Sequence, residues 1–256
     1  PDCPDFKNFT IFPFPLSSTL KMSGIQVKLY QTDNGPCPYR EEKTWRNLSF
    51  QTSELPTDGY TSLLNQGFRR SGLSIYHPVC SGCQSCIPIR VDVQNFSQNK
   101  GQRRTWRKNK DIRVEHHPLE FNRQDFELYQ RYQKDWHELE TPVEEAEYYE
   151  FLIESPVPTE ILRYYLGKKL IGVGWLDRLP ELISSVYFVF DPEFVSMRLG
   201  IFSLLYEIEY ARFLDIRWLY LGYWVESSSK MNYKADFQPA QILRDSRWIP
   251  FQEKQK

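Results

Sequence analysis

The chain has 256 residues and a formal net charge of −1, with 41% hydrophobic and 16% aromatic residues, enough for a large core and too apolar for an intrinsically disordered chain. No apolar run approaches the roughly 20 residues of a membrane-spanning helix, and the first residues lack the basic and apolar blocks of a signal peptide. We therefore expect a cytoplasmic protein with no membrane partner.

The first half of the chain should mix strands and helices. The proline-rich first 38 residues should be mostly extended, with a strand at 25–30. A helix is expected from Thr57 to Gly72, and alternating apolar and polar residues predict a strand at 87–93, where Pro88 suits a sheet edge. A basic helix after Ser97, a strand at 112–116 and a helix capped by Asn122 should follow.

The sequence of the second half predicts more strands, separated by fewer helices. A helix near 144–153 should precede a hairpin at 161–166 and 170–176, a strand at 182–190, a helix at 199–214, a strand at 217–222 and a short helix or turn at 227–235. This order matches an N-acetyltransferase-like (GNAT) fold. We predict an α+β protein with a smaller N-terminal Cys-containing domain at 1–98 and a GNAT-like (acyl-CoA N-acyltransferase-like) catalytic domain at 99–256.

Three of the five cysteines form the motif Cys80-x-x-Cys83-x-x-Cys86. This spacing lets thiolates converge on one soft metal, and zinc or an iron–sulfur cluster needs about four ligands. Cys37 could supply the fourth, with His77 as a substitute; the alternative is three thiols whose spacing is accidental. A disulfide scaffold would spread its cysteines more widely, so the pattern favours a reducing compartment.

A dense basic segment spans residues 100–113 and contains a single acidic residue, Asp111. Its positive charges therefore have almost no partners for i,i+4 pairing, and Trp106 adds an aromatic ring suited to unstacked bases. The segment is interpreted as a nucleic-acid surface, and the alternative is an ordinary solvated helix face. Two arginines in GFRRSG at 67–72 could hold phosphate or offset a helix dipole.

Aromatic residues and lysines gather after the strand expected at 217–222. The stretch YLGYW at 220–224 is followed by KMNYK at 230–234, and such residues at a strand exit can line a pocket or simply cap the core. The turn at 196–201, before the helix expected at 199–214, has one glycine where acyl-CoA binders usually show the pattern R-x-x-G-x-G/A. An acyl-CoA donor is therefore disfavoured.

Together these stretches resemble the arginyl-tRNA–protein transferase family, in particular its compact bacterial branch of aspartate/glutamate leucyltransferases. In chain order the matching stretches are GFRRSG (67–72), YHPVCSGCQSCIPIRV (76–91), QRRTWRKN (102–109), LYQRY (128–132), YFVFDP (187–192), YLGYWVESSSKMNYK (220–234) and FQPAQIL (237–243). Each stretch alone is unspecific, and their joint occurrence in this order makes the resemblance specific.

The resemblance implies an enzyme that transfers leucine from Leu-tRNA to an acceptor protein with N-terminal Asp or Glu and so marks it for degradation by the N-end rule. The same transfer could use Arg-tRNA as its donor. A non-catalytic RNA-binding zinc module and an acyl-CoA N-acyltransferase are less favoured functions. No cofactor is required for the transfer, and the resemblance gives weight to a structural zinc or iron–sulfur site at Cys37, Cys80, Cys83 and Cys86.

On this basis each candidate residue has an expected role. The tRNA phosphates are expected to bind Arg69, Arg70, Arg103, Arg104, Arg107 and Lys108. The substrate pocket is expected at Tyr220, Gly222 and Trp224, and the catalytic candidates are Tyr223, Lys230, Tyr233, Lys234 and, as a base, Asp191.

Overall fold

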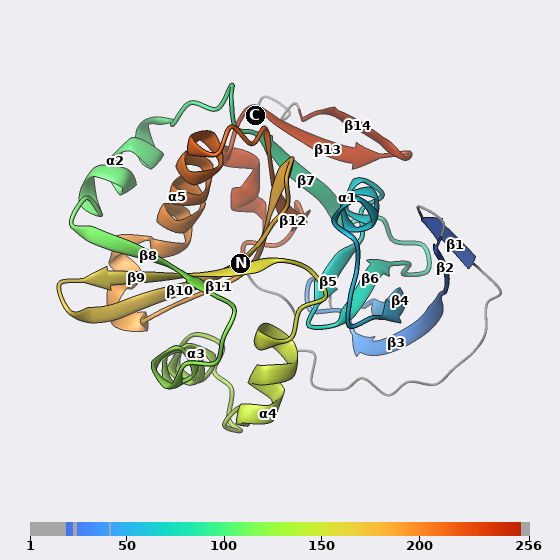
Figure 1. Ribbon diagram of the computed structural model, residues 1–256, viewed down its shortest axis with the longest axis horizontal. Helices are drawn as coiled ribbons and strands as arrows, with labels where there is room; N and C mark the ends of the chain where they lie inside the picture. Colours follow the sequence, from blue (N-terminus) through green and yellow to red (C-terminus); the bar gives the residue numbers. More distant parts are fainter. Residues whose placement is uncertain (1–18, 23–24, 41, 252–256) are drawn as a thin grey trace.

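The computed structural model describes residues 19–22, 25–40 and 42–251, which form two main sheets and their helices (Figure 1). Cys3, the region compared with signal peptides and most of the extended segment predicted at the N-terminus lie outside the described residues. Strands β1 (Thr19–Met22) and β2 (Ile25–Lys28) pair as a short antiparallel ribbon.

The larger sheet has eight strands in the order β14–β13–β7–β12–β11–β10–β9–β8. Neighbours are antiparallel except β11 and β12, which are parallel. The bounds are β7 (Ile87–Asp92), β8 (Ile112–Pro118), β9 (Thr159–Leu166), β10 (Lys169–Arg178), β11 (Leu182–Phe190), β12 (Trp218–Trp224), β13 (Ala240–Arg244) and β14 (Arg247–Pro250). The strands predicted at 112–116, 161–166, 170–176, 182–190 and 217–222 are confirmed.

The parallel pair opens part-way along its length. β11 and β12 are in register only from Leu182–Trp218 to Ser184–Tyr220, whereas β10 stays paired with β11 to Phe190. The two central strands therefore separate in the middle of the sheet, and this opening positions the candidate site.

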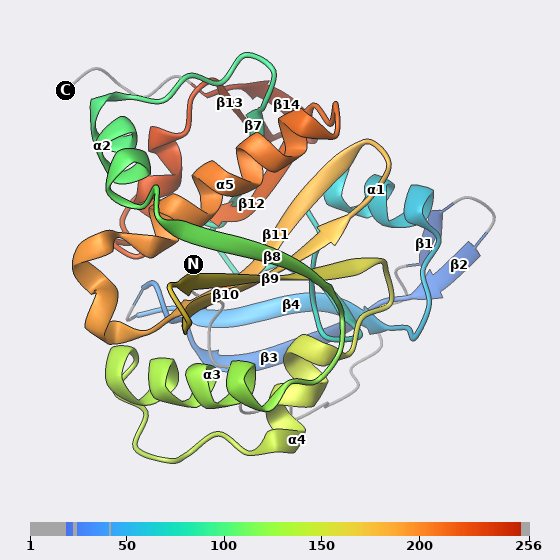
Figure 2. The ribbon, with the colours of Figure 1, turned by 60° about the vertical axis from the view of Figure 1, so that its left-hand side comes forward.

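Helices cover both faces of the larger sheet (Figure 2). On one face, α5 (Leu199–Phe213) packs on β11 and β12 and carries α2 (Lys100–Lys108) against its outer side. On the other face lie α3 (Arg123–Trp136), α4 (Glu145–Tyr148) and the π-helix η1 (Tyr149–Ile153). Asn122 caps α3 as predicted, whereas α2 begins with a capping box of Asn99 and Gln102 and not at Ser97.

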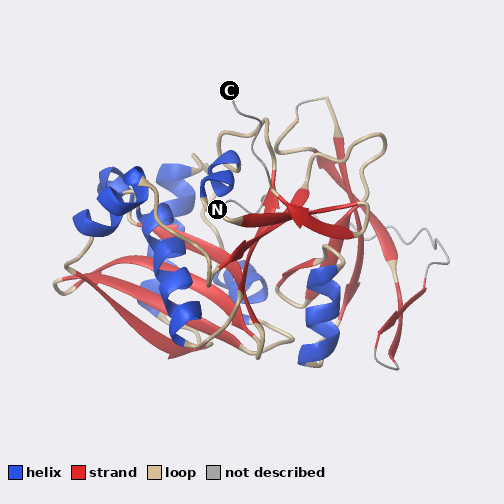
Figure 3. Cartoon of the chain, turned by 90° about the horizontal axis from the view of Figure 1, so that it is seen from above, coloured by secondary structure: helices blue, strands red, loops and turns tan. Residues whose placement is uncertain are grey.

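The smaller sheet lies beside the larger one (Figure 3). Its order is β3–β4–β6–β5, and α1 (Thr57–Asn65) contributes Tyr60, Leu63 and Leu64 to its core. The strands are β3 (Tyr30–Pro36), β4 (Thr44–Gln51), β5 (Arg69–Ser71) and β6 (Ser74–Pro78).

The helix predicted to run to Gly72 is wrong beyond Asn65. Gly67 takes φ +87° just after the helix, and the chain then enters the β5–β6 hairpin, whose turn includes Gly72 at φ +54°. A β-carbon at Gly72 would also clash with the carbonyl oxygen of Glu150. Both glycines therefore allow backbone conformations that end the helical pattern early.

The α+β prediction holds at the level of a mixed molecule with antiparallel and mixed sheets. β7, expected in the N-terminal domain, is an interior strand of the larger sheet between β13 and β12. Pro88, expected at an edge, is registered opposite Tyr223 of β12 and lies beyond the registered pairs of β7 with β13. Within the described ranges, no helix has both the length and the apolar character to cross a bilayer.

Candidate functional site

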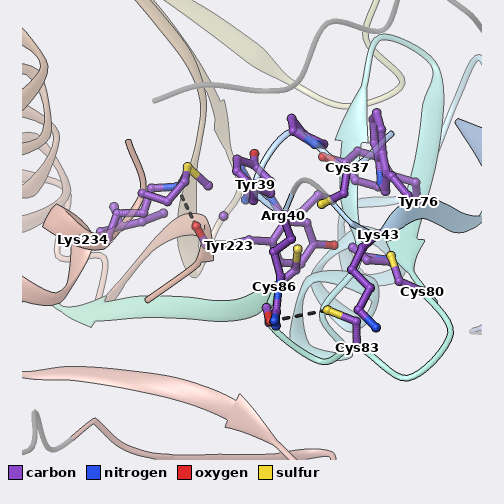
Figure 4. Close-up of a pocket in the computed structure, with 18 of the residues that line it drawn as sticks. Cys37, Tyr39, Arg40, Lys43, Tyr76, Cys80, Cys83, Cys86, Tyr223 and Lys234 are labelled. Carbon is purple, nitrogen blue, oxygen red and sulfur yellow. Dashed lines mark hydrogen bonds between the residues drawn. The ribbon is translucent and has the colours of Figure 1, made fainter. Parts of the chain in front are cut away.

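A pocket lies between the two sheets where β11 and β12 separate (Figure 4). The larger sheet and α5 supply one wall, including Ser185, Leu204 and Gly222. The smaller sheet supplies the opposite wall through β5, β6 and the loops around 37–45 and 80–86. Side chains from both sheets therefore meet in one cavity.

The charged side chains that the described residues contribute to this pocket are all cationic. Arg40 is exposed and Lys43 half-buried, whereas Arg69 is only 8% and Lys234 only 4% exposed. Among the described residues, no Asp or Glu lines the pocket. The pocket is therefore suited to anionic groups, with two accessible cations and two enclosed ones.

Arg69 is fixed by neutral partners on β11. Its Nη1 donates to Ser184 Oγ at 2.8 Å, and its Nη2 donates to the carbonyl oxygen of Ser185. The guanidinium lies against Gly222, where φ is +80° and an added β-carbon would come within 3.4 Å of Arg69 Nε. A glycine is therefore favoured at position 222 for two reasons: its φ is positive, and a larger side chain would crowd the Arg69 guanidinium.

Lys234 enters from the short 3₁₀-helix η3 (Asn232–Asp236). Its Nζ donates to the carbonyl oxygen of Tyr223 at 2.8 Å and contacts Met231 Sδ at 3.7 Å. Tyr223 in turn donates its hydroxyl to the carbonyl oxygen of Gly67 at 2.8 Å. These bonds tie η3, β12 and the loop before β5 together around the pocket.

Four reduced cysteines lie across the pocket from Lys234: Cys37, Cys80, Cys83 and Cys86 (Figure 4). Burial, with a contribution from the other three thiols, raises the pKa of Cys86 to about 12. The hydrogen-bonding hydroxyl of Ser85, whose Oγ lies 3.4 Å from Cys83 Sγ, lowers the pKa of Cys83. All four cysteines line the same wall of the pocket.

The cysteine wall has the donor chemistry of a metal site without its geometry. Within the described part of the chain, no three Cys, His, Asp or Glu residues are arranged closely enough to hold one ion. The Arg46 N–H donates to Cys80 Sγ at 3.5 Å, and His77 Nδ1 lies 3.1 Å from the carbonyl oxygen of Gly67. The thiols fit zinc or an iron–sulfur cluster, but they do not share a coordination shell in this conformation.

Behind the pocket lies a carboxyl group that sequence reasoning missed. Glu207 of α5 is 1% exposed, and its Oε1 is 3.4 Å from Ser185 Oγ. Burial raises the pKa of Glu207 to about 8. Its place on the buried face of α5, beside Leu204, Ile208 and Ala211, is the signal that could have found it, since a lone charge on an apolar helix face is unusual.

Comparison with known proteins identifies the family. The profile described as "Arginine-tRNA-protein transferase, N terminus" matches residues 35–104, and that described as "Arginine-tRNA-protein transferase, C terminus" matches 124–244. The "Aspartate/glutamate leucyltransferase" of Teredinibacter turnerae is 36% identical over 88% of this chain and 94% of that protein, and that of Saccharophagus degradans is 37% identical over 88% and 98%.

The chain belongs to the arginine-tRNA-protein transferase family. It is accordingly an enzyme of the transferase class, and the family resemblance read from the sequence is confirmed. Among solved structures, L-PGS from Bacillus licheniformis superimposes with a TM-score of 0.42 and 12% identity, over 66% of this chain and 59% of that one.

The structure of this transferase brings several of the predicted residues together. Arg69, Gly222, Tyr223, Tyr233 and Lys234 all line the pocket, and so do the four cysteines. Arg40, Lys43 and Ser185 join them without having been predicted. Nothing in the local sequence distinguishes these three, because each stands in an ordinary loop or strand.

Other candidates lie elsewhere in the transferase. The Tyr220 hydroxyl donates to Asn65 and accepts from Arg90, and the Trp224 ring packs on Phe251 at 4.9 Å. Neither lines the pocket, and Lys230 is an exposed residue outside it.

Asp191 caps the 3₁₀-helix η2 (Pro192–Met197) and also lies outside the pocket. Its Oδ1 accepts from the backbone N–H of Glu193 at 3.1 Å, and its Oδ2 lies 3.1 Å from Lys169 Nζ. This position does not fit the expected role of a catalytic base, because the carboxylate is already committed to the cap and to an ion pair.

Arg70 does not fit the expected role in phosphate binding. It is 3% exposed, and its guanidinium donates to both carboxylate oxygens of Asp177. By contrast, the four predicted cations of α2 are all exposed: Arg103, Arg104, Arg107 and Lys108. Trp106 is half-buried, with its ring 5.4 Å from that of Phe202, so it anchors α2 on α5.

Proposed function

We propose that this protein transfers leucine from Leu-tRNA to the N-terminal Asp or Glu of acceptor proteins. The names of the relatives support this reaction, and the cationic pocket that no described carboxylate lines is the structural observation that carries it. Both substrates bring negative charge: phosphates on the tRNA and a side-chain carboxylate on the acceptor. The leucine added to the acceptor marks it for degradation, in the cytoplasm where charged tRNA is available.

The chemistry needs little from the enzyme beyond positioning. The aminoacyl ester is already activated, so the neutral α-amine of the acceptor attacks the ester carbonyl directly. An amide bond forms, the ester bond to the tRNA ribose breaks, and the amine proton passes to solvent as the ribose oxygen takes one up. A model α-amine has a pKa near 7.7–8.0, so an adequate fraction is neutral at physiological pH. Holding two large substrates in line supplies most of the rate.

The exposed cations lie in two places, on α2 and at the pocket. Arg103, Arg104, Arg107 and Lys108 form a positive surface on α2 that we assign to tRNA phosphates. Arg40 and Lys43, the accessible cations of the pocket, would meet the acceptor end of the tRNA as it enters. The parallel strands that open over the pocket support a GNAT-like domain in which an aminoacyl-tRNA end occupies the opening.

The cysteine wall is proposed as a structural site for zinc or an iron–sulfur cluster, held by Cys37, Cys80, Cys83 and Cys86. Four thiolates are the donor set that these groups use, and when bound the group would clamp the loops around 37 and 80–86. The metal and iron content per chain of protein purified without chelator tests this. A C80S/C86S variant with the same content as the wild type would exclude the site.

One experiment decides the reaction. Purified protein is incubated with tRNA charged with labelled leucine or arginine and with peptides that begin with Asp, Glu, Arg or Lys. We expect leucine to pass to the Asp and Glu peptides and not to the Arg and Lys peptides. Transfer of arginine in its place would select the alternative donor. The proposal is overturned if no charged tRNA donates and an acyl-CoA thioester is turned over.

A further inference from the structure

Arg69 is a buried cation that has no carboxylate among its hydrogen-bond partners in the described part of the chain. Three arginines are buried among the described residues: Arg69, Arg70 and Arg163. Arg70 pairs with Asp177 and Arg163 with Asp125, whereas Arg69 contacts only a hydroxyl and a carbonyl oxygen. A buried charge is costly unless it is paired, so an unpaired guanidinium at the wall of a pocket points to an anionic ligand.

The carboxyl groups near Arg69 do not compensate its charge at neutral pH. Glu207 interacts with it electrostatically, but burial holds the pKa of Glu207 at about 8, so this carboxyl is mostly neutral at pH 7. Asp177 is committed to Arg70, to the Tyr60 hydroxyl at 2.9 Å and to the Thr159 hydroxyl at 2.8 Å. The positive charge of Arg69 is therefore left for a ligand in the pocket.

The guanidinium of Arg69 is also held in a fixed orientation that suits the binding of a carboxylate. Its contacts with described residues use two of its five N–H donors, which leaves three. Hydrogen bonds to Ser184 and Ser185 fix the plane of the guanidinium, and the backbone of Gly222 packs against it. A fixed guanidinium can give two parallel N–H bonds to one carboxylate, a geometry that lysine cannot reproduce.

We propose that Arg69 binds the side-chain carboxylate of the acceptor's first residue and thereby selects Asp and Glu over Asn and Gln. This inference rests on the proposed leucine transfer. A carboxylate is favoured over a tRNA phosphate because Arg69 is enclosed, whereas Arg40 and the cations of α2 are exposed where a polynucleotide can reach them. Arg69 is thus a specificity-determining residue, whereas Arg40, which we assign to the tRNA end, does not distinguish acceptors.

The test compares acidic acceptors with their amides. kcat/KM is measured at saturating Leu-tRNA for peptides that begin with Asp, Asn, Glu or Gln, using wild type, Arg69→Gln and Arg69→Lys. We expect Arg69→Gln to reduce the preference for Asp over Asn by on the order of 100-fold, as expected when one partner of a buried charge pair is removed. Arg69→Lys should retain part of the preference, because it keeps the charge and loses the paired geometry.

Arg40→Gln is the matched control, since Arg40 is an exposed arginine of the same pocket. It should lower kcat/KM for all four peptides by the same factor. If the wild type transfers no leucine, the proposed function fails. If it transfers leucine and Arg69→Gln keeps the Asp-to-Asn ratio, Arg69 is not the selecting residue. An unchanged ratio with a raised KM for Leu-tRNA would instead place an RNA phosphate at Arg69.

Folding of the variants is checked by thermal unfolding. If Arg69→Gln does not fold, the Arg69→Lys comparison decides. A loss of roughly tenfold or more confined to Asp and Glu peptides supports the assignment, and an equal loss for all four overturns it. Competition supplies a second readout on the wild type. A short Asp peptide with a blocked α-amine should inhibit transfer more strongly than its Asn counterpart, and equal inhibition would contradict the proposal.

Discussion

Glu207 illustrates how a single buried group sets a pH dependence. Its folded-state pKa of about 8 lies above the ordinary value of 4.5 because the carboxyl is buried, and burial outweighs the hydrogen bond from Ser185 and the positive charge of Arg69, which lower the pKa. Between these two values the folded protein holds the proton and the unfolded chain does not. The folded state therefore binds more protons, and its stability falls as the pH rises through this window.

Glu207→Gln should remove that dependence. Glutamine has nearly the same shape, accepts from Ser185 and carries no charge at any pH. We expect the stability of the variant relative to the wild type to grow by about 3 to 4 kcal/mol from pH 5 to pH 8, on the scale of 1.36 kcal/mol per pKa unit. Urea unfolding at several pH values measures it. Glu209 is a partly exposed residue on the same helix, so Glu209→Gln should change the stability little at any of these pH values. If the plot of stability against pH for Glu207→Gln runs parallel to that of the wild type, Glu207 is not the source of the pH dependence.

Two adjacent residues of the same type can have different roles, and this limits what the sequence reveals about single residues. Arg69 and Arg70 were assigned one role because they stand together in GFRRSG. In a strand, consecutive side chains point to opposite faces, so Arg69 reaches the pocket and Arg70 reaches Asp177. The prediction of a helix through these positions hid the alternation. Recognising the two glycines as positive-φ positions would have exposed it.

At the scale of elements, α2 is the clearest case of a sequence pattern that survives in the structure. Its capping box fixes its start, Trp106 anchors it on α5, and its cations remain exposed. Charge reversal in R103E/R104E should weaken Leu-tRNA binding by roughly tenfold or more at low salt. It should also flatten the plot of log affinity against log salt, by about 0.9 per lost phosphate contact. Fluorescence anisotropy across a salt series measures both.

The control is R244E/R247E, a pair of exposed arginines at the β13–β14 turn. It changes the net charge of the protein equally and should leave the salt slope unchanged. Equal effects of the two double variants would mean that the global charge governs tRNA binding. An unchanged affinity and slope in R103E/R104E would remove α2 from the interface.

Long elements with strong periodicity were predictable, and short ones were not. The helices at 123–136 and 199–213 and the strands of the hairpin at 159–178 follow from periodicity and caps. The strands β4, β5, β6, β13 and β14 were missed, because three to eight residues of mixed polarity do not distinguish a strand from a loop. Their pairing depends on partners that are distant in sequence.

For the molecule as a whole, the pocket depends on the contact between the two sheets. Its lining comes from segments near residues 40, 70, 80, 185, 220 and 234, which no local pattern connects. The motifs around the cysteines and after β12 were recognised separately. Their convergence follows only from the way the smaller sheet packs beside the opening of β11 and β12. Most of the motifs that line the site could therefore be recognised in the sequence, whereas their arrangement in space could not.

The Arg70–Asp177 pair is a strong polar link between those sheets, and it yields a prediction for the whole fold. Asp177 on β10 is fully buried and accepts from Arg70 of β5, from Tyr60 of α1 and from Thr159 of β9. Asp177→Ala removes the buried carboxylate to which the Arg70 guanidinium donates three hydrogen bonds. Such a change typically costs about 3–5 kcal/mol, so we expect a loss of this size in the free energy of unfolding, measured with urea.

Asp33→Ala is the matched comparison, because Asp33 forms an ion pair with Arg46 on the smaller sheet at 3.2 Å. Both of these side chains are substantially exposed, at 55% and 40%, so the loss should stay below about 1 kcal/mol. Asp177→Ala should also lower leucine transfer in the fraction that remains folded, since Arg69 is the next residue to Arg70 and is held by the same packing. If both variants lose the same small stability, the sheets are held by their apolar contacts and the buried pair contributes little to their alignment.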